Sequence, residues 1–264
     1  MSNIHPTAVI HQNVEMGKNI TIGPYAIIEQ NVTIGDGTRI DAFAQIKSHT
    51  IIGKNNHIHS YACIGGEPQD LKYKGAPTKL YIGDNNIIRE FVTIHRGTEE
   101  GGGITKIGSE CLMMAYVHIA HDCIIGNRVI MANAATLGGH VVIEDNAVIG
   151  GLSAVHQFVR IGKFAYIGGM TGVSQDVPPY SLIAGERGKM YGLNLVGLKR
   201  HGFSKDKVEM LKKAYKLIWR SGLRREEAID RILNELGDCP EVVYLVKFVE
   251  KSQRGIVPPS KVKK

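Results

Sequence analysis

Aliphatic residues recur at every sixth position along most of the chain. The first block of this repeat runs without a slip from Ile4 to Ile64, a short block runs from Ile82 to Ile94, and a third runs from Ile107 to Val173. Six is a multiple of the two-residue period of a β-strand and fits no α-helix, so each aliphatic residue can point inward from a short strand. We call these residues the anchors and expect them to form the core.

A chain that bends every six residues closes into a three-sided coil of about 18 residues, and backbone hydrogen bonds then join successive coils. Glycine often follows an anchor, as at Gly23, Gly53 and Gly126. A bend at these points could need a positive φ or the absence of a Cβ. The repeat therefore predicts a parallel β-helix over residues 1–185, in which residues n and n+18 are neighbours.

Two segments break the repeat and are expected to project as loops, over residues 65–81 and 95–106. The first spans two further hexads but places Asp70 and Ala76 at anchor positions, and the second contains surplus residues around the glycine-rich run from Gly97 to Gly103. Loops on a rigid scaffold often carry function. The sequence alone leaves open whether these loops do so or are tolerated surface insertions.

Helical spacing replaces the hexads in the last third of the chain. Ser204 is suited to cap a helix that carries Val208 to Trp219 on its apolar face, and a second helix from Ala228 is expected to end at Gly237. A third helix is expected to begin near Pro240. The sequence thus predicts an all-β parallel β-helix domain followed by a small α-helical C-terminal domain over residues 186–264.

The overall composition is that of a folded protein, which we expect to stay in the cytoplasm. Hydrophobic residues make up 43% and charged residues 22% of the chain, which argues against disorder. We find no run of about 18 apolar residues and no signal peptide in the first residues, so we expect no integral membrane segment. Four cysteines, at positions 63, 111, 123 and 239, form no CxxC pair, which argues against a disulfide framework or a cysteine-based zinc site.

The charge is distributed unevenly along the chain. Residues 1–185 contain 13 basic and 15 acidic residues, a net charge of −2, whereas residues 186–264 contain 19 basic and 10 acidic residues, a net charge of +9. Such asymmetry often marks a surface that meets an acidic partner, such as nucleic acid, a membrane or an acidic carrier protein. We consider nucleic acid the weakest of these, because no aromatic platform or binding motif accompanies the charge.

Four histidines, His118, His121, His140 and His156, fall within 39 residues of the third block. Stacking coils of about 18 residues should place His121, Gly139 and Gln157 in one column. A neutral imidazole can remove a proton from a hydroxyl group, and the adjacent glycine can present an open backbone N–H to an oxyanion. The cluster therefore indicates a catalytic site, although a single histidine would more often be a surface residue.

Several sequence runs resemble those of one family, the acyl-carrier-protein-dependent UDP-N-acetylglucosamine O-acyltransferases, which begin lipid A synthesis. These hexapeptide-repeat transferases fold as left-handed parallel β-helices and usually form homotrimers, so the resemblance implies both properties here. The likeness extends from about Ile4 into the C-terminal helices. The matching runs are Gln69–Tyr73 (QDLKY), Ile94–Gly97 (IHRG), His118–Cys123 (HIAHDC), Ala154–Phe158 (AVHQF), Gln175–Tyr180 (QDVPPY) and Asn194–Arg200 (NLVGLKR).

The resemblance implies a catalytic role for three residues. His121 corresponds to the family's general base, and the amide of Gly139 to its oxyanion donor. Asp122 is a candidate for orienting the imidazole, but side chains of adjacent residues on an extended strand point apart, so the sequence leaves its role open. The implied reaction transfers a (3R)-3-hydroxyacyl group from acyl carrier protein to the 3-hydroxyl of UDP-N-acetylglucosamine and needs no metal or other cofactor.

The same match implies a set of substrate-binding residues. Asp70 and Lys72 would contact the acyl chain or phosphate, and Gly169 corresponds to the position that limits acyl length. Val196 and His201 depart from the family pattern, so uridine recognition can differ in detail. The remaining implied contacts are His118, His140, His156 and Gln157 for the nucleotide sugar and Asn194 and Arg200 for uridine.

Two other functions remain open from the sequence. One is a metal-dependent carbonic anhydrase of the same fold, for which His118, His121 and His140 could be the zinc ligands. The other is a non-catalytic hexapeptide scaffold. The sequence does not decide the acyl chain length or whether the acceptor group is a hydroxyl or an amine.

Overall fold

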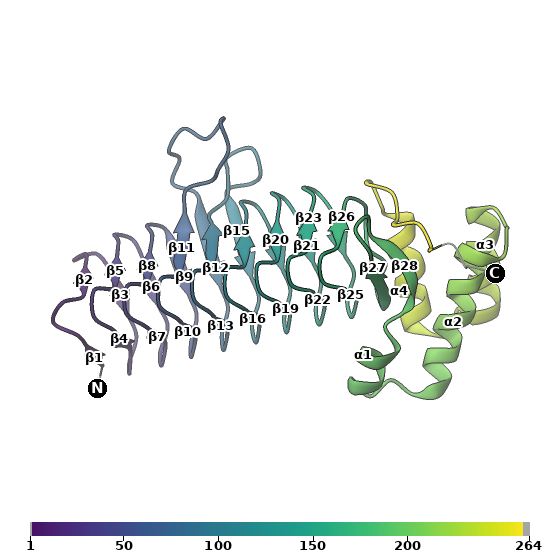
Figure 1. Cartoon of the computed structure of the whole chain (residues 1–264), viewed down its shortest axis with the longest axis horizontal. Coiled ribbons are helices and arrows are strands. Elements are labelled where there is room, and N and C mark those ends of the chain that lie inside the picture. Colours follow the sequence, from purple (N-terminus) through teal and green to yellow (C-terminus); the bar gives the residue numbers. More distant parts are fainter. Residues whose placement is uncertain (1, 261–264) are drawn as a thin grey trace.

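The computed structural model describes residues 2–260, whose strands form three long sheets around one core (Figure 1). Sheet A contains β1 (Asn3–Ile4), β4 (Thr21–Ile22), β7 (Arg39–Ile40), β10 (His57–Ile58), β13 (Ile87–Ile88), β16 (Leu112–Met113), β19 (Ile130–Met131), β22 (Val148–Ile149), β25 (Tyr166–Ile167), β27 (Ser181–Ala184) and β28 (Lys189–Leu193). Sheet B contains β2 (Val9–Ile10), β5 (Ile27–Ile28), β8 (Gln45–Ile46), β11 (Cys63–Gly66), β14 (Thr93–His95), β17 (His118–Ile119), β20 (Thr136–Leu137), β23 (Ala154–Val155) and β26 (Gly172–Val173). Sheet C contains β3 (Glu15–Met16), β6 (Thr33–Ile34), β9 (Thr50–Ile52), β12 (Lys79–Ile82), β15 (Ile104–Ile107), β18 (Ile124–Ile125), β21 (Val142–Ile143) and β24 (Arg160–Ile161).

The strand register confirms the predicted coil length. Ile22 pairs with Ile40, 18 positions later, and this offset holds along most of the parallel ladders. Ile58 instead pairs with Ile88, and Ile88 with Met113, because the two loops add residues without breaking the pairing. The chain folds as a left-handed parallel β-helix. Both loops project from the same side of the prism (Figure 1).

The anchors form the core as predicted, except in the first coil. Anchors from Ile22 onward lie at or below 3% exposure, whereas Ile4 is 40% and Met16 39% exposed. The prediction of burial was wrong for these two residues because the first coil ends the prism, so no earlier coil covers it. Burial of an isoleucine side chain stabilises a fold by about 1.5–3 kcal/mol, and the repeated anchors therefore supply most of the driving force.

The bends in the coil are made by two different kinds of position. Residues three places after an anchor, such as Asn31, Tyr61 and Asp122, have φ between about 53° and 65° and turn the chain. Gly23, directly after an anchor, does not have a positive φ, and a Cβ there would lie 2.7 Å from the backbone nitrogen of Ala42 in the next coil. Of the two predicted reasons for these glycines, close approach between coils is therefore the one that applies.

The C-terminal region contains α1 (Leu195–Arg200), α2 (Lys205–Arg220), α3 (Arg225–Leu236) and α4 (Pro240–Glu250). Ser204 caps α2 by accepting a hydrogen bond from the Lys207 backbone N–H, as predicted. The sequence analysis missed α1 and the antiparallel hairpin of β27 and β28, whose turn contains the expected boundary at residue 185. Residues 261–264 of the expected helical domain lie outside the described residues.

The chain returns from the helices to the end of the prism. Isolated bridges join Asp176 to Ile256 and Met190 to Pro259, so the segment after α4 closes the last coil. In the described part of the chain, each helix is too short or too polar to cross a membrane.

Candidate active site

The predicted catalytic residues lie where the chain turns from sheet B to sheet C, a row of turns that we call corner BC. His121 and Asp122 follow β17, and Asp122 has φ 58°, in the left-handed region that turns the chain. Both projecting loops leave and rejoin the prism at this corner, between β11 and β12 and between β14 and β15. The scaffold therefore brings the histidines and the loops together.

Asp122 is a buried carboxylate held by the second loop. Its side chain is 1% exposed. Thr98 donates two hydrogen bonds to it, from the backbone N–H to Oδ1 at 2.9 Å and from the hydroxyl to Oδ2 at 2.6 Å. The backbone N–H of Asp122 donates to Oγ1 of Thr105 at 2.8 Å. These bonds fix the carboxylate and attach the loop over residues 95–106 to the corner.

The imidazole of His121 is fixed through its Nδ1 atom, which lies 2.8 Å from Oδ2 of Asp122. A carboxylate in this position favours the tautomer with the proton on Nδ1, which leaves Nε2 as the basic nitrogen. The sequence left the role of Asp122 open because adjacent side chains on a strand diverge. The structure brings the two together because Asp122 sits at a turn and not on a strand.

Gly139 lies against the imidazole of His121, one coil further along. A Cβ on Gly139 would be 2.6 Å from Cε1 and 2.8 Å from Nε2 of His121. The N–H groups on either side, of Gly138 and His140, donate to the carbonyls of Val155 and His121. Within the described residues, the Gly139 N–H donates no hydrogen bond, so a base and an open amide lie side by side. The predicted column is thus present.

His140 completes the group around the carboxylate. Its Nε2 atom lies 3.7 Å from Oδ2 of Asp122, its ring meets that of His121 edge to face at 5.2 Å, and it stacks on Phe158 at 4.5 Å. His121, Asp122 and His140 could together bind a metal ion. His118, the third ligand in the carbonic anhydrase interpretation, does not belong to this group, and Asp122 already accepts two hydrogen bonds from Thr98.

His118 and His95 form a second, drier pair beside this group. Nδ1 of His118 lies 2.7 Å from the Thr93 hydroxyl, and its ring meets that of His95 at 4.9 Å. Burial lowers the pKa of His118, and burial followed by repulsion from His118 and His121 lowers the pKa of His95 to about 4. Both are therefore neutral at pH 7. Within the described residues, Nδ1 of His95 is buried without a hydrogen-bond partner.

His156 and Gln157 lie further along corner BC, exposed beside the C-terminal segment. Arg254 contacts Nδ1 of His156 at 3.1 Å. His156 also borders an open cavity of about 580 Å³ whose walls include Arg187, Lys189 and Pro258. The scaffold thus continues the histidine row into a basic cavity of a size suited to a small ligand.

Asp70 and Lys72 lie on the first loop, which contacts the second. Lys72 forms an ion pair with Glu100 at 2.9 Å, and its backbone N–H donates to Oδ1 of Asp70. Both residues line a small cleft of about 50 Å³ together with Thr98. The two loops therefore form one unit, which Thr98 attaches to Asp122.

Three predicted binding residues do not join this site within one chain. Gly169 lies two residues after the anchor Ile167 of sheet A, at the turn from sheet A to sheet B that we call corner AB. Asn194 caps α1 by accepting a hydrogen bond from Gly197 and donates to the carbonyl of Phe164. Arg200 is exposed at the end of α1.

The sequence analysis missed residues that hold the loops in place. Thr98 anchors Asp122, and Arg96 donates to the carbonyl of Gly65, to Glu67 and to the hydroxyl of Tyr73, tying the start of the second loop to the first. The IHRG run that contains Arg96 was noted as a motif. Its structural role could not be read from it, because the contacts join positions that are 23 to 31 residues apart.

Comparisons with known proteins agree on one family. A family model described as UDP N-acetylglucosamine O-acyltransferase, domain 2, matches residues 176–257, and a bacterial transferase hexapeptide model matches residues 31–66 and 104–139. Relatives from Myxococcus xanthus and Thermodesulfovibrio yellowstonii are 52% and 56% identical, each over 97% of this chain and 99% of the relative. Both are named acyl-(acyl-carrier-protein)–UDP-N-acetylglucosamine O-acyltransferase.

Solved structures give the same result. The UDP-N-acetylglucosamine O-acyltransferase from Moraxella catarrhalis superposes with a TM-score of 0.93 at 43% identity, over 96% of this chain and 99% of that one. The UDP-N-acetylglucosamine acyltransferase from Campylobacter jejuni superposes with a TM-score of 0.93 at 40% identity, over 98% of this chain and 100% of that one.

Proposed function

The chain belongs to the acyl-(acyl-carrier-protein)–UDP-N-acetylglucosamine O-acyltransferases, and we propose how its own residues perform the reaction of that family. The enzyme transfers a 3-hydroxyacyl group from acyl carrier protein to the 3-hydroxyl of UDP-N-acetylglucosamine, which commits this sugar nucleotide to lipid A. This assignment disfavours the carbonic anhydrase and the non-catalytic scaffold as alternatives.

In the proposed mechanism, Nε2 of His121 removes the proton from the 3-hydroxyl of the glucosamine ring. The oxygen attacks the thioester carbonyl carbon, and the resulting oxyanion accepts a hydrogen bond from the Gly139 N–H. The carbon–sulfur bond then breaks, and the His121 imidazolium returns the proton to the departing thiolate. Asp122 holds the imidazole in the required tautomer and stabilises its positive charge.

The strongest support for this mechanism is the position of the His121 ring. The carboxylate of Asp122 holds its Nδ1 atom, and the edge of the ring that carries Cε1 and Nε2 faces Gly139. A general base and an oxyanion donor must lie side by side, because each must come within about 3 Å of the reacting atoms of the substrate. The direct test is mass spectrometry of the product from UDP-N-acetylglucosamine and a set of 3-hydroxyacyl carrier proteins. His121→Ala should lower product formation by about 10²–10⁴-fold while leaving the thermal midpoint nearly unchanged. Unfolding of that variant would instead indicate a structural histidine.

We propose that His140, His118, His156 and Gln157 contact the nucleotide sugar and that Asp70 and Lys72 contact the acyl chain or phosphate. The row of histidines along corner BC and the cavity beside His156 support the first assignment. The second assignment is supported by the cleft that Asp70 and Lys72 share with Thr98, which donates to Asp122, the partner of His121. Asn194 and Arg200 are assigned to uridine from the family resemblance.

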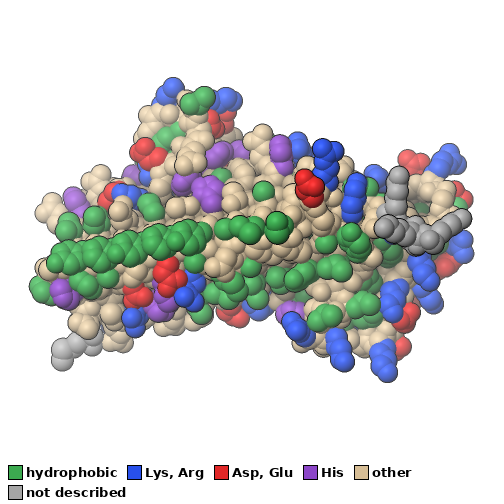
Figure 2. All heavy atoms as spheres, in the orientation of Figure 1, with side chains coloured by type: hydrophobic (Ala, Val, Ile, Leu, Met, Phe, Trp, Pro, Cys, Tyr) green, Lys and Arg blue, Asp and Glu red, His purple; other side chains and the backbone are tan. Residues whose placement is uncertain are grey.

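The positions of Gly169 and the catalytic histidine support a homotrimer whose site is shared between chains. Gly169 lies on corner AB and His121 on corner BC, so a single chain separates the proposed acyl-length position from the base. Corner AB also carries an exposed apolar stripe, which is visible in Figure 2. Its stacked rings are Tyr25, Phe43, Tyr61, Phe91 and Tyr116, with successive centroids 5.0–5.3 Å apart. A stripe of this size usually marks an interaction surface.

We propose that the C-terminal segment with net charge +9 receives acyl carrier protein. Many of its lysines and arginines in the described residues lie on the four helices that follow the prism (Figure 2). Opposite charge accelerates encounter between two proteins, and salt screens this effect. The kcat/KM for the carrier protein should therefore fall with ionic strength, while the KM for UDP-N-acetylglucosamine in saturating carrier protein should change less.

A further inference from the structure

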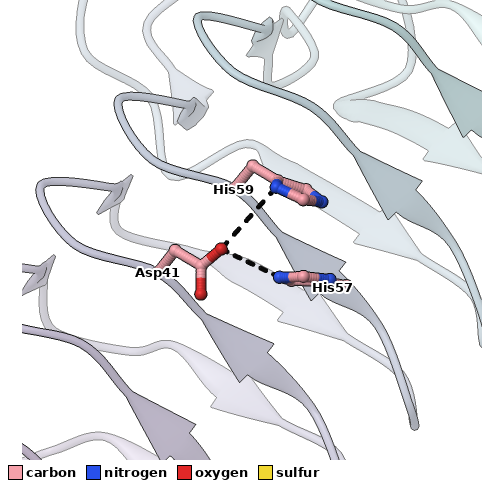
Figure 3. A group of neighbouring side chains, drawn as sticks. All are labelled: Asp41, His57 and His59. Carbon is pink, nitrogen blue, oxygen red and sulfur yellow. Dashed lines mark hydrogen bonds and ion pairs between the residues drawn. The ribbon is translucent and has the colours of Figure 1, made fainter.

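A second group of histidine and acidic side chains lies on sheet A, away from corner BC. Asp41 follows β7, His57 is the first residue of β10, and His59 follows β10 (Figure 3). The register pairs Arg39 with His57 and Ile40 with Ile58, so the next residues in the two coils, Asp41 and His59, are neighbours. Because the anchors point inward, these flanking residues point outward and converge on the surface.

The three ligand atoms are spaced as a metal site would need. Nε2 of His57 lies 2.9 Å and Nδ1 of His59 lies 3.6 Å from Oδ2 of Asp41, and all three atoms lie within 4.8 Å of one another. Zinc bonds to nitrogen and oxygen are about 2.0–2.2 Å long, so neighbouring ligands in a tetrahedral shell are separated by about 3.3 Å. The imidazole rings stack at 3.8 Å, which presents both ring nitrogens to the same carboxylate.

Hydrogen bonds within this group do not satisfy the ring nitrogen of His59 that faces Asp41. His57 is within hydrogen-bond distance of Asp41, but Nδ1 of His59 lies 3.6 Å from Asp41 and 3.5 Å from Oε1 of Glu90, both longer than a good hydrogen bond. Glu90 comes from the following coil and could supply a fourth ligand. A cation at the centre would satisfy the two nitrogens and the carboxylates at once.

The charges around the group are compatible with such a cation. Arg39 donates to the other oxygen of Asp41 at 2.7 Å, which leaves Oδ2 to the histidines. Arg89 donates to both carboxylate oxygens of Glu90, to Oε2 at 2.9 Å and to Oε1 at 3.2 Å. Side-chain exposure of 18–34% for Asp41, His57, His59 and Glu90 leaves a path for an ion to enter. Two imidazoles with one carboxylate favour zinc over magnesium or calcium, which prefer ligand sets made of oxygen atoms.

We propose that Asp41, His57 and His59 form a zinc site, with Glu90 or water in the fourth position. The ion would join Asp41 of one coil to the two histidines of the next, so it would fasten adjacent turns of the prism. This role is independent of the acyl transfer at corner BC, because none of these residues contacts the catalytic group.

The experiment is a titration of chelator-treated full-length protein with Zn²⁺ by calorimetry and with Co²⁺ by visible absorption. The parent should bind one Zn²⁺ at this site, and its thermal midpoint should rise when Zn²⁺ binds. With Co²⁺ in place of Zn²⁺, the parent should show the visible absorption of tetrahedral Co²⁺. Asp41→Asn, His57→Ala and His59→Ala should each lower Zn²⁺ affinity at least tenfold, and circular dichroism in the absence of metal checks that they fold. His57→Gln provides a second variant that preserves more of the side-chain volume.

His140→Ala is the matched control, because His121, Asp122 and His140 form the other group able to bind a metal. This variant should keep the parent's affinity for Zn²⁺ within about twofold. Loss of binding in His140→Ala with retention in His59→Ala would overturn the proposal and place the ion at the catalytic corner. Equal binding by the parent and all four sheet A variants would also overturn it. Acyl transfer by His59→Ala should match the parent, which separates this test from that of the proposed function.

Discussion

Nδ1 of His121 lies 2.8 Å from Oδ2 of the residue that follows it, Asp122. Consecutive side chains on a strand would face opposite ways, but the positive φ of Asp122 turns the chain and folds the carboxylate back onto the ring. The proposed general base and the group proposed to orient it therefore occupy one corner of one coil.

Replacing Asp122 with Asn should lower kcat about 100-fold or more. An amide cannot stabilise the imidazolium as a carboxylate does, and it can favour the wrong tautomer. Steady-state kinetics from pH 6 to 9 checks this. The deficit should persist over that range, because it arises from orientation and charge and not from a simple shift of the pH optimum. A kcat within threefold of the parent would show that Asp122 is not a positioning residue.

Gly139→Ala should reduce kcat by about 100-fold while changing the fold little. The added Cβ would lie 2.6–2.8 Å from the His121 ring, so the imidazole must move away from the proposed reacting centre. Because the ring is a side chain that can shift, we expect the thermal midpoint to fall by only a few degrees. A crystal structure of the variant should show a displaced His121, and an active variant with an unmoved ring would contradict the proposed role of this position.

Thr98→Val should weaken the attachment of the second loop to the catalytic corner. It removes the hydroxyl that donates to Asp122 at 2.6 Å and leaves the buried carboxylate with one fewer donor. The free energy of unfolding should fall by about 1–3 kcal/mol, and kcat should fall by about tenfold. Thr98→Ser retains the donor and is the control. Equal behaviour of the two variants in denaturant titration and kinetics would refute the attachment.

Acid should destabilise the protein through His95. Its pKa is lowered to about 4 in the folded state, whereas an unfolded histidine titrates near 6.5. Below pH 6.5 the unfolded chain therefore binds more protons than the folded chain, so stability decreases as the pH falls towards about 4 and levels off below that. His118, whose pKa is also lowered, adds in the same direction.

His95→Gln should flatten this part of the stability profile. Thermal midpoints measured between pH 4.5 and 7.5 for the variant and the parent check the prediction, since the difference between them should grow in favour of the variant as the pH falls. A difference that is constant with pH would show that His95 titrates normally.

Tyr61→Glu should disrupt the proposed homotrimer. Tyr61 is 50% exposed at the middle of the stacked apolar stripe, and a carboxylate there would be buried without a partner on association. Light scattering should give about three times 28.9 kDa for the parent and a smaller mass for the variant. Asn55→Glu, at an exposed turn on another corner, is the control. A parent of about 29 kDa would contradict both the trimer and a shared site.

The scaffold could be predicted from the sequence because each coil repeats the same pattern of inward-pointing anchors and turns. Once the anchors fixed the register, the approach of His121 to Gly139 followed from counting residues. The exposed anchors Ile4 and Met16 show the limit of this reasoning, because a period identifies an inward direction and not whether another coil covers it.

The parts that could not be predicted depend on contacts between unlike segments. Thr98 reaches Asp122, 24 positions away, through a loop without a repeat, and Arg254 reaches His156 from the C-terminal segment. The antiparallel strand β28 follows a run of parallel strands, so the hexad pattern carried no signal for it. Asp41 and His59 were 18 positions apart and could have been aligned, but no motif marked them.

The coils on both sides of each loop pair with each other, so the scaffold of this chain is independent of the length of its loops. β11 pairs with β14 and β12 with β15 across the inserted residues, with a register shift only between Ile64 and Gly66 at the start of the first loop. A change in loop length should therefore leave the pairing of the anchors unchanged. Insertions or deletions in the loops can therefore occur while the distance from His121, the proposed base, to Gly139, the proposed oxyanion donor, stays constant. Exchange of these loops between relatives is therefore a direct test of the proposed contact between the first loop and the acyl donor.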